Sequence, residues 1–366
     1  MDLNYITVAI PTHGRADLVV RLINALKNES KDIEVIIVDD SQPEDRVIIA
    51  QALASMPRTH LLVEYINVSA KRNLAAKSAS GSLVLFLDSD CIPQPGLITA
   101  HVNFWKNAPI DAASGLGVLN MEGPESFWWR IIQQTDLLSP FVWAKKYIRV
   151  PWGPTANLSV KRDIFLAHGG FDERLSPPAT GGEDVELGLR LQSKGYVTYC
   201  IPDATAVHST ETWLKISQIL TRLWMWGRGD AELLERFPER CRSNPPSLLS
   251  TLAGLTIIST ILAVFTPDVR WLLVTPVTFI LIMSSISVLQ RKNNNTWLGA
   301  YVRLVYLVLD ASRALHAKSR LSRILLNRFD FSPDDTPVWK EIAADQWHYA
   351  IWTIFTMTVF ALWIPR

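Results

Sequence analysis

The chain has 366 residues, of which 48% are hydrophobic, and its 36 Lys and Arg residues nearly balance its 35 Asp and Glu residues, which leaves a formal net charge of +1. This balance gives no reason to expect a nucleic-acid partner, because proteins that bind nucleic acids usually carry a basic surplus. The Gly and Pro contents exclude collagen-like and low-complexity chains. The three cysteines share no CxxC spacing, so no zinc or disulfide framework is expected.

Strand-like and helix-like segments alternate along the first part of the chain. Strands are expected at Tyr5–Ile10, Glu34–Val38, Leu61–Ile66 and Leu83–Leu87, and helices at Ala16–Lys27, Arg46–Leu53 and Lys71–Ser80. This alternation predicts an α/β domain with a doubly wound, mostly parallel sheet. Ligands of such sheets bind at the carboxyl ends of the strands, so the polar residues that follow the strands are the first candidates for a site.

Asp88-Ser89-Asp90 follows the fourth expected strand. Two carboxylates at this spacing can converge on one hard divalent cation, and Mg²⁺ and Mn²⁺ in such sites usually share their oxygen ligands with substrate phosphates. A polar turn without a ligand is the alternative interpretation of the pair. His208, which follows a strand expected at Tyr196–Ile201, is a candidate third metal ligand through a neutral imidazole.

Other polar groups stand at comparable places in the pattern. Asp39 and Asp40 end the second strand and can accept a hydrogen bond from a nucleobase or a ribose, although a simple turn is equally consistent with them. Lys71 and Arg72 stand at a helix start, where cations can meet a pyrophosphate or a base. No GxGxxG follows the first strand and no GxxxxGK[ST] occurs, which disfavours a nicotinamide dehydrogenase and a P-loop NTPase.

Acidic residues precede a helical pattern at Gly181-Gly-Glu183-Asp184-Val-Glu186. Acidic residues are favoured at a helix N-terminus, so a structural explanation exists for them. The functional interpretation is a general base: a carboxylate beside a bound phosphate can deprotonate an acceptor hydroxyl as it attacks.

Three runs without Asp, Glu, Lys or Arg lie near the end of the chain, at 248–266, 271–290 and 347–364. Each approaches the roughly 20 residues that a helix needs to cross a bilayer. A buried helical hairpin of a soluble protein is the alternative. We expect a membrane region over 247–366 that follows a catalytic domain over 1–240.

A basic stretch over 297–328 separates the second run from the third. Arg303 would lie in the middle of the bilayer if Trp297–Leu309 crossed it, which is costly. We therefore expect 297–328 to be a basic amphipathic segment on the anionic inner leaflet. The N-terminus has no signal-peptide pattern, so the expectation is a multi-pass protein of the inner (plasma) membrane with a cytoplasmic catalytic domain.

In this order, the motifs resemble those of the inverting family 2 glycosyltransferases of GT-A fold. The resemblance covers about residues 4–240, and its most specific part is the run AKRNLAAKSASGSLVLFLDSD (Ala70–Asp90), followed by GGFDE and GEDVELGLRL. It implies a GT-A catalytic domain, a Rossmann-like α/β fold with a mostly parallel sheet, placed before an all-α transmembrane region.

The resemblance also implies roles for individual residues. Pro11 and Thr12 would line the nucleotide site, Asp39 with Asp40 would hold the nucleobase, Arg72 would contact the base or the diphosphate, Asp88 would lie by the ribose, Asp90 would ligate the metal, and His208 would contact the metal or a phosphate. The segment with Gly170, Phe171 and Asp172 would border the sugar and acceptor pocket, and Glu183 would belong to the same pocket. Asp184 of the Glu183-Asp184 pair would be the catalytic base.

One departure concerns the QxxRW motif of processive members such as cellulose and hyaluronan synthases. Here Gln218, Arg222 and Trp224 stand at a different spacing, and Trp224 and Trp226 occupy that region. The departure favours transfer of a single sugar. The two Trp side chains are expected to stack on the sugar or the acceptor.

The resemblance thus implies an enzyme that uses Mg²⁺ or Mn²⁺ and a nucleotide-sugar donor. It would transfer one sugar to an acceptor hydroxyl or phosphate, with inversion at the anomeric carbon. The membrane region favours a lipid-linked or membrane-proximal acceptor. A processive polysaccharide synthase and a non-catalytic membrane scaffold with a degenerate transferase domain are the alternatives.

Overall fold

The computed structural model describes residues 6–29, 33–243, 247–289, 298–317, 327–333 and 339–364. Contacts divide the chain into two compact units, Met1–Glu125 with Leu137–Leu214, and Ser126–Asp136 with Lys215–Arg366. The sequence analysis places a domain boundary after residue 240. By contact, however, α5 (Phe127–Ile132) and α8 (Ile216–Arg236) belong to the second unit.

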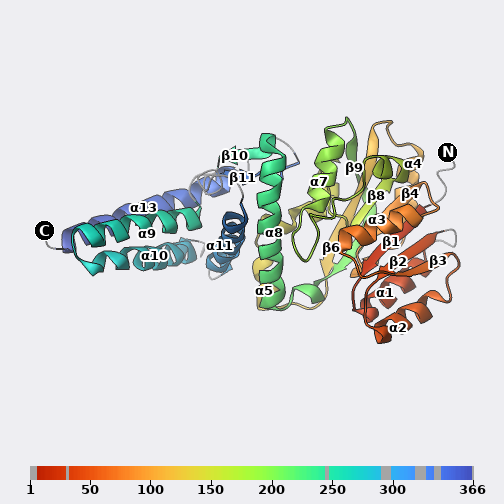
Figure 1. The fold of residues 1–366 in the computed structure, drawn as a ribbon, viewed down its shortest axis with the longest axis horizontal. Helices are drawn as coiled ribbons and strands as arrows, with labels where there is room; N and C mark the ends of the chain where they lie inside the picture. The colour runs from red at the N-terminus through yellow and green to blue at the C-terminus, as the bar shows by residue number, and fades with distance from the viewer. Residues whose placement is uncertain are drawn as a thin grey trace. The chain divides into compact units, whose positions relative to one another are not determined.

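A nine-stranded sheet forms the centre of the first unit (Figure 1). Its strands are β1 (Ile6–Thr12), β2 (Glu34–Asp39), β3 (Thr59–Val63), β4 (Leu83–Leu87), β5 (Cys91–Pro93), β6 (Ala112–Glu122), β7 (Arg149–Val150), β8 (Asn157–Lys161) and β9 (Val197–Ser209). They lie in the order β3-β2-β1-β4-β8-β6-β9-β5, and β7 pairs with β9. Strands β1 to β4, β6 and β9 share one direction, while β5, β7 and β8 run the opposite way. The sheet is therefore mixed, because β8 enters antiparallel between β4 and β6.

Helices cover both faces of this sheet. They are α1 (Ala16–Lys27), α2 (Pro43–Leu53), α3 (Val68–Ser78), α4 (Leu97–Lys106), α6 (Arg162–Ala167) and α7 (Glu183–Gln192), with 3₁₀ turns η1 (Asp136–Lys145) and η2 (Thr210–Trp213). In Figure 1, α1 and α2 lie on one face and α3 lies on the other. The chain places β2 and β3 on one side of β1 and then β4 on the other, so the strand order reverses between β1 and β4. Ligands of open α/β sheets bind outside the carboxyl ends of the strands at such a reversal.

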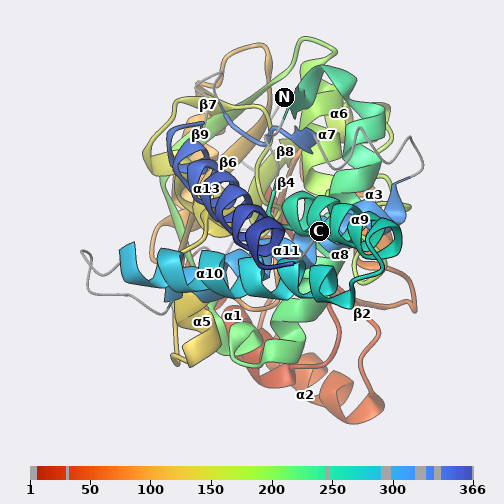
Figure 2. The same cartoon turned by 90° about the vertical axis from the view of Figure 1, so that its left-hand side faces the viewer.

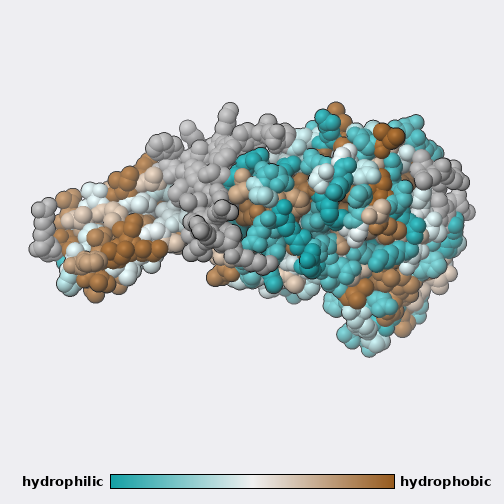
Figure 3. Space-filling model, turned by 45° about the horizontal axis from the view of Figure 1, so that its top comes forward, coloured by the Kyte–Doolittle hydropathy of each residue, from teal (hydrophilic) through white to brown (hydrophobic). Residues whose placement is uncertain are grey.

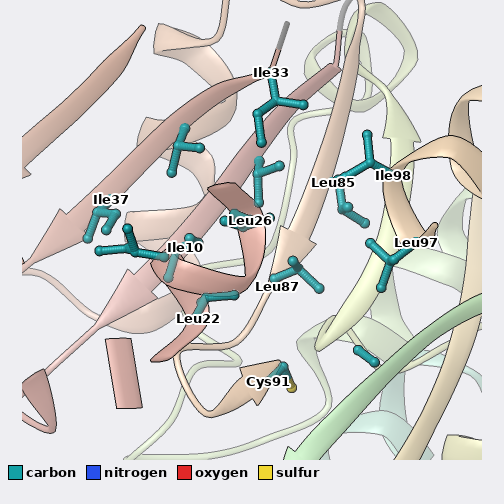
Figure 4. Close-up of a cluster of buried hydrophobic side chains, with 14 of the residues drawn as sticks. Ile10, Leu22, Leu26, Ile33, Ile37, Leu85, Leu87, Cys91, Leu97 and Ile98 are labelled. Carbon is teal, nitrogen blue, oxygen red and sulfur yellow. The ribbon is translucent and has the colours of Figure 1, made fainter. Parts of the chain in front are cut away.

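The apolar core of the first unit fixes the position of that reversal. Leu22 and Leu26 of α1 are fully buried in one apolar cluster with Ile10 of β1 and Leu85 of β4, and Figure 4 shows these side chains. Burying one such side chain stabilises the fold by roughly 1.5–3 kcal/mol. The Cys91 side chain belongs to the same cluster, so the start of β5 is anchored directly behind the turn that follows β4.

Asn157, a buried polar residue of β8, forms hydrogen bonds with β6 and β9 where the pairing of these two strands is irregular. The register of that pair shifts between Leu116 and Val118. The Asn157 amide donates to the carbonyl oxygens of Val118 at 3.0 Å and Ala204 at 2.9 Å, and its own oxygen lies 3.0 Å from His101 Nε2. Burial lowers the pKa of His101 to about 4, so the ring is neutral at physiological pH. Asn157 thus satisfies carbonyl groups that the irregular ladder leaves free.

The second unit contains two groups of helices. In the first group, α11 (Leu298–His316) contacts α5 and α8. The Tyr301 ring meets Phe127 at 5.1 Å, and the Ser312 hydroxyl donates to the Trp224 carbonyl at 2.5 Å. A side chain at Gly227 would collide with the Leu309 carbonyl, so this glycine allows α8 and α11 to approach closely.

The second group consists of α9 (Leu248–Phe265), α10 (Val274–Leu289) and α13 (Trp339–Trp363), and Figure 2 shows these helices side by side. Leu255, Val274 and Phe360 are buried between them. Many apolar side chains point outward instead, and Figure 3 shows apolar surface at this end of the chain. The exposed apolar residues of these helices include Ile257, Ile258, Ile261, Val264, Phe265, Ile280, Ile351, Ile354 and Leu362.

Among the described residues, only α9 is long and apolar enough to cross a membrane, with a mean hydropathy of 2.2 and 17% of its residues buried. The run expected at 271–290 forms the turn η4 (Val269–Leu273) and α10, and residue 290 lies outside the described residues. The run at 347–364 is the end of α13. The basic segment 297–328 includes α11, whereas its residues 318–326 lie outside the described part.

Asn157→Ala is expected to lower the free energy of unfolding by about 2–4 kcal/mol, because it leaves two buried carbonyl groups without a donor. Chemical denaturation of the full chain in detergent measures this loss. Asn107→Ala, at an exposed position after α4, is the control and is expected to cost less than about 0.5 kcal/mol. Equal stability of the two variants would contradict this role of Asn157.

Candidate active site

The turn Asp88-Ser89-Asp90 lies at the carboxyl end of β4, where the strand order reverses. The Cys91 amide donates to the Asp88 carbonyl at 2.9 Å and closes this turn. Asp90 is buried, and its carboxylate has contacts on both oxygens. Oδ2 accepts from Arg15 Nη1 at 3.2 Å and from the Thr212 hydroxyl at 3.3 Å, while Oδ1 lies 3.6 Å from His208 Nε2.

His208 reaches Asp90 because β5 pairs with β9 in a register that sets Cys91 opposite His208. His208 Nδ1 lies 3.1 Å from the Ser209 carbonyl oxygen. A carbonyl can only accept a hydrogen bond, so Nδ1 carries a proton and Nε2 is the ring nitrogen that faces Asp90. This arrangement is typical of metal-binding histidines, which donate their other nitrogen to a carbonyl or carboxylate. Ligand atoms of Asp90, Cys91 and His208 lie within 4.8 Å of one another.

Arg72 joins the turn after β4 to the start of α7. Its Nη2 donates to Asp88 Oδ1 at 2.6 Å and its Nη1 donates to Glu183 Oε1 at 2.9 Å. Arg72 and Glu183 are both buried, and the Arg72 guanidinium also lies 5.8 Å from the centre of the Phe171 ring. The two acidic motifs that the sequence analysis singles out therefore meet at one guanidinium.

Asp184 lies in the first turn of α7, next to Glu183, and it is half-buried. Burial, followed by the charge of Glu183, raises the pKa of Asp184 to about 7, although a hydrogen bond from the Val185 amide and the Arg72 charge oppose the shift. Burial also raises the pKa of Glu183 against the opposing effect of Arg72. A carboxylate with a pKa near neutrality is suited to proton transfer at physiological pH.

The two aspartates after β2 have different surroundings. Asp39 is fully buried: it accepts from the amide and hydroxyl of Ser41 and from Arg46 Nε at 3.2 Å. The Asp40 side chain is 18% exposed, and its Oδ1 lies 2.8 Å from His13 Nδ1 and 2.5 Å from Lys71 Nζ. Lys71, ahead of His13, holds the pKa of Asp40 below its usual value, although burial opposes this shift.

Pro11 and Thr12 are buried at the end of β1, where Thr12 is paired with Asp39 in the register of β1 and β2. The Thr12 carbonyl accepts from Lys71 Nζ at 2.6 Å. These two residues are thus placed beside Asp40 and Lys71. Their contact with a nucleotide stays a prediction.

The segment Gly169–Glu173 is held by α3. Asn73 accepts from the Phe171 amide at 2.8 Å and donates to the Phe171 carbonyl at 2.9 Å. Gly170 has a φ of 68°, and a side chain there would collide with Asn73. Phe171 is buried against Phe86, and Asp172 is paired with Arg174. These contacts hold in place the segment with Gly170, Phe171 and Asp172, whose contact with the sugar and acceptor stays a prediction.

Trp224 and Trp226 belong to the second compact unit, on α8, so their place in the acceptor pocket stays a prediction. Two residues that contact Asp90, Arg15 and Thr212, are not among the residues that the sequence predicts for the site, and Lys71 is predicted there only as a cation at a helix start. Arg15 lies between β1 and α1, and Lys71 lies near the start of α3. Both positions follow strands, where the sequence pattern predicts site residues. No local signal marks Thr212, because only the course of the chain beyond β9 brings it to Asp90.

The chain is similar in sequence to known glycosyltransferases. Residues 7–171 match the family model described as Glycosyl transferase family 2, a segment that contains Asp88 and Asp90 and ends before Asp184. O-antigen biosynthesis protein RfbC of Myxococcus xanthus is 26% identical over 262 residues, which cover 62% of this chain and 20% of that protein. Glycosyltransferase AglE of Haloferax volcanii is 23% identical over 241 residues, which cover 63% of this chain and 74% of that protein.

The chain therefore spans about a fifth of the length of the first relative and about three quarters of the second. Among solved structures, the mannosyltransferase PcManGT from Pyrobaculum calidifontis in complex with GDP-Man and Mn²⁺ has a similar fold. It is 15% identical, with a TM-score of 0.51, and the similarity covers 98% of this chain and 87% of that chain. Residues 7–171 are thus similar to the glycosyl transferase family 2 model, and the fold of the chain is GT-A-like.

Proposed function

We propose that this protein is a membrane-bound glycosyltransferase that moves one sugar from a nucleotide-sugar donor to a membrane-proximal acceptor, with inversion at the anomeric carbon. The observation that carries the proposal is the Arg72 bridge between Asp88 and Glu183. It joins the two motifs in which a donor site and a general base are expected. The PcManGT structure, which contains GDP-Man and Mn²⁺, supports a nucleotide-sugar donor and a divalent cation.

The residues around Asp90 fit a divalent cation. The buried Asp90 carboxylate and Nε2 of His208 face each other, and a carbonyl accepts a hydrogen bond from Nδ1 of the same ring, so Nε2 would offer its lone pair to a cation in the neutral imidazole. Asp90 and His208 would hold the cation, which when bound would neutralise the negative charge of the departing diphosphate. The Cys91 thiol is less suited to Mg²⁺ or Mn²⁺, because these hard cations prefer oxygen ligands.

In the proposed reaction, Asp184 takes the proton of the acceptor hydroxyl. The acceptor oxygen forms a bond to the anomeric carbon from the face opposite the diphosphate, and the diphosphate leaves with the electron pair of the broken bond. One displacement inverts the configuration. Arg72 fixes Glu183, the chain neighbour of Asp184, and so positions the base relative to the donor side of the site.

For the nucleobase, the surroundings of the two aspartates favour Asp40 over Asp39. Every oxygen of Asp39 is already bonded within the protein and the side chain is fully buried. Asp40 keeps an exposed edge beside the exposed ring of His13. We therefore assign Asp39 to bracing the end of β2, and Asp40 to contact with the donor.

The outward apolar side chains of α9, α10 and α13 support membrane attachment. A helix of 18 residues such as α9 spans about 27 Å, close to the roughly 30 Å hydrocarbon core of a bilayer. Contiguous apolar surface of this kind is rare on soluble monomers. In the proposed topology, α9 leaves the catalytic side, η4 and α10 return, and α13 leaves again. Attachment would place a lipid-linked acceptor near the transferase domain.

The direct experiment is a screen of the full chain in detergent against a panel of nucleotide sugars with Mn²⁺ or Mg²⁺, in which released nucleoside diphosphate is measured. Release from one donor that EDTA abolishes would support the proposal. No metal-dependent binding or turnover of any donor would favour the non-catalytic scaffold. Products longer than one added sugar would favour the processive synthase.

Asp184→Asn is expected to lower kcat by about 10²–10⁴-fold, because it removes the base, while affinity for the donor stays within about twofold. Calorimetry measures the affinity and diphosphate release measures the rate. Asp163→Asn is a matched control: Asp163 also accepts from the amide of the following residue, at 2.8 Å in both cases, but it is exposed on α6. Wild-type turnover by Asp184→Asn would refute the assignment of the base.

The rate should also follow the ionisation of Asp184. Because the raised pKa is about 7, we expect kcat/KM to rise about tenfold per pH unit below 7 and to level off above it. The same shift means that the protonated carboxyl group favours the folded state, so its contribution to stability is present at acid pH and is lost as the pH rises through 7. A rate profile that stays flat between pH 5.5 and 8 would contradict this prediction.

The double substitution Ile257→Lys with Ile261→Lys is expected to weaken flotation of the full chain with lipid vesicles, because each charge near the middle of α9 costs about 2.5–3.5 kcal/mol in a bilayer. Ile110→Lys with Ile148→Lys, at exposed positions of the first unit, is the control and should float like the wild type. Equal flotation of both variants would show that α9 does not cross the membrane.

A further inference from the structure

Arg15 is the cation that contacts Asp90 in this structure. Its Nη1 lies 3.2 Å from Asp90 Oδ2, although the two residues are 75 positions apart in the sequence. The Asp90 side chain is 7% exposed, whereas the Arg15 side chain is 47% exposed. The guanidinium therefore reaches from the surface to a buried carboxylate. Because nearly half of the Arg15 side chain is exposed, the guanidinium has room to move away from Asp90.

The backbone at the base of this side chain is fixed. Arg15 directly precedes α1 and has φ 58° and ψ 44°, a left-handed conformation that is unfavourable for a residue with a side chain. The preceding Gly14 donates its amide to the Ser41 hydroxyl at 2.6 Å, and Ser41 is itself bonded to Asp39. Strain of this kind persists where surrounding contacts impose it, and here it aims the side chain at the carboxyl end of β4.

The charge of Arg15 is unfavourable for its place on the helix. The N-terminus of α1 carries a partial positive charge, which favours anions and disfavours a guanidinium. The Arg15 side chain makes no capping hydrogen bond there. An arginine at this place gains most from an anion that lies in front of it, and a diphosphate matches the planar, forked guanidinium better than any other group expected at this site.

Arg15 and a divalent cation would compete for Asp90. A cation held by Asp90 and His208 would repel the guanidinium, because both carry positive charge and both use the same carboxylate. Resting on the proposed function, we propose that Arg15 neutralises Asp90 in the metal-free protein and moves to the donor diphosphate when the divalent cation binds. Arg15 would then be a second positive group on the leaving diphosphate, and it would link binding of the cation to binding of the donor.

This exchange predicts that one variant, Arg15→Gln, changes the affinity for the cation and the affinity for the diphosphate in opposite directions. Removing the charge of Arg15 removes a competitor of the cation but also removes a ligand of the diphosphate. Arg15→Gln should therefore bind Mn²⁺ alone about fivefold more tightly, while it should bind inorganic pyrophosphate at saturating Mn²⁺ about tenfold more weakly. Loss of a merely structural contact would weaken both affinities together or leave both unchanged.

The experiment uses the full chain in detergent. Electron paramagnetic resonance of free Mn²⁺ gives the affinity for the cation, and calorimetry with pyrophosphate gives the affinity for the diphosphate group. Arg21→Gln is the matched control, since Arg21 lies on the same helix but pairs with Asp17 and Glu211, and both of its affinities should stay unchanged. Arg15→Lys, which keeps the charge but not the fork, should give a pyrophosphate affinity between those of the wild type and Arg15→Gln.

The outcomes separate this inference from the proposed function. If the wild type binds Mn²⁺ and pyrophosphate but Arg15→Gln moves both affinities in one direction, or neither, the exchange is wrong and the metal site stands. If the wild type binds no Mn²⁺, the proposed metal site fails and the exchange fails with it. A thermal unfolding midpoint of Arg15→Gln close to that of Arg21→Gln excludes misfolding as the cause of a change.

Discussion

A single buried guanidinium, that of Arg72, connects the turn after β4 to the start of α7, although Arg72 and Glu183 are 111 residues apart in the sequence. Arg72 would be costly to bury alone, but Asp88 and Glu183 surround it with negative charge. Although burial opposes it, Asp88 and then Glu183 raise the pKa of Arg72, so the cation is retained. Without Arg72, the carboxylates of Asp88, Glu183 and Asp184 would repel one another. The relative positions of the donor side and the proposed base depend on this contact.

The fold around Arg72 was predictable where local pattern and tertiary structure agree. The expected ranges Ala16–Lys27 and Leu83–Leu87 match α1 and β4, because each has one dominant signal, an amphipathic period or a short apolar run. Strand β6 lacks such a signal, since Gly115 and Gly117 interrupt its pattern. The antiparallel insertion of β8 depends on pairing between distant segments, which no local window contains.

The positions of the candidate site residues in the fold were predictable to a similar extent. Asp88, Asp90 and Glu183 follow strands or begin a helix, so their positions in the pattern identify them. The difference between Asp39 and Asp40 was not predictable, because it depends on which carboxylate Ser41 and Arg46 bind. The contact of Arg15 with Asp90 depends on a left-handed backbone at a strand-to-helix turn, and local preferences argue against such a conformation for arginine.

The grouping of α5 with α8 and α11 has a practical consequence for recombinant work. A fragment cut at residue 240, the boundary that sequence alone favours, would keep α5 and α8 but lose α11. Tyr301 would no longer cover Phe127, and the close packing of α11 on Gly227 would be lost. Such a fragment would expose apolar helix faces and aggregate, so a crystallisation sample should retain α11 even where the outward-facing apolar helices are removed.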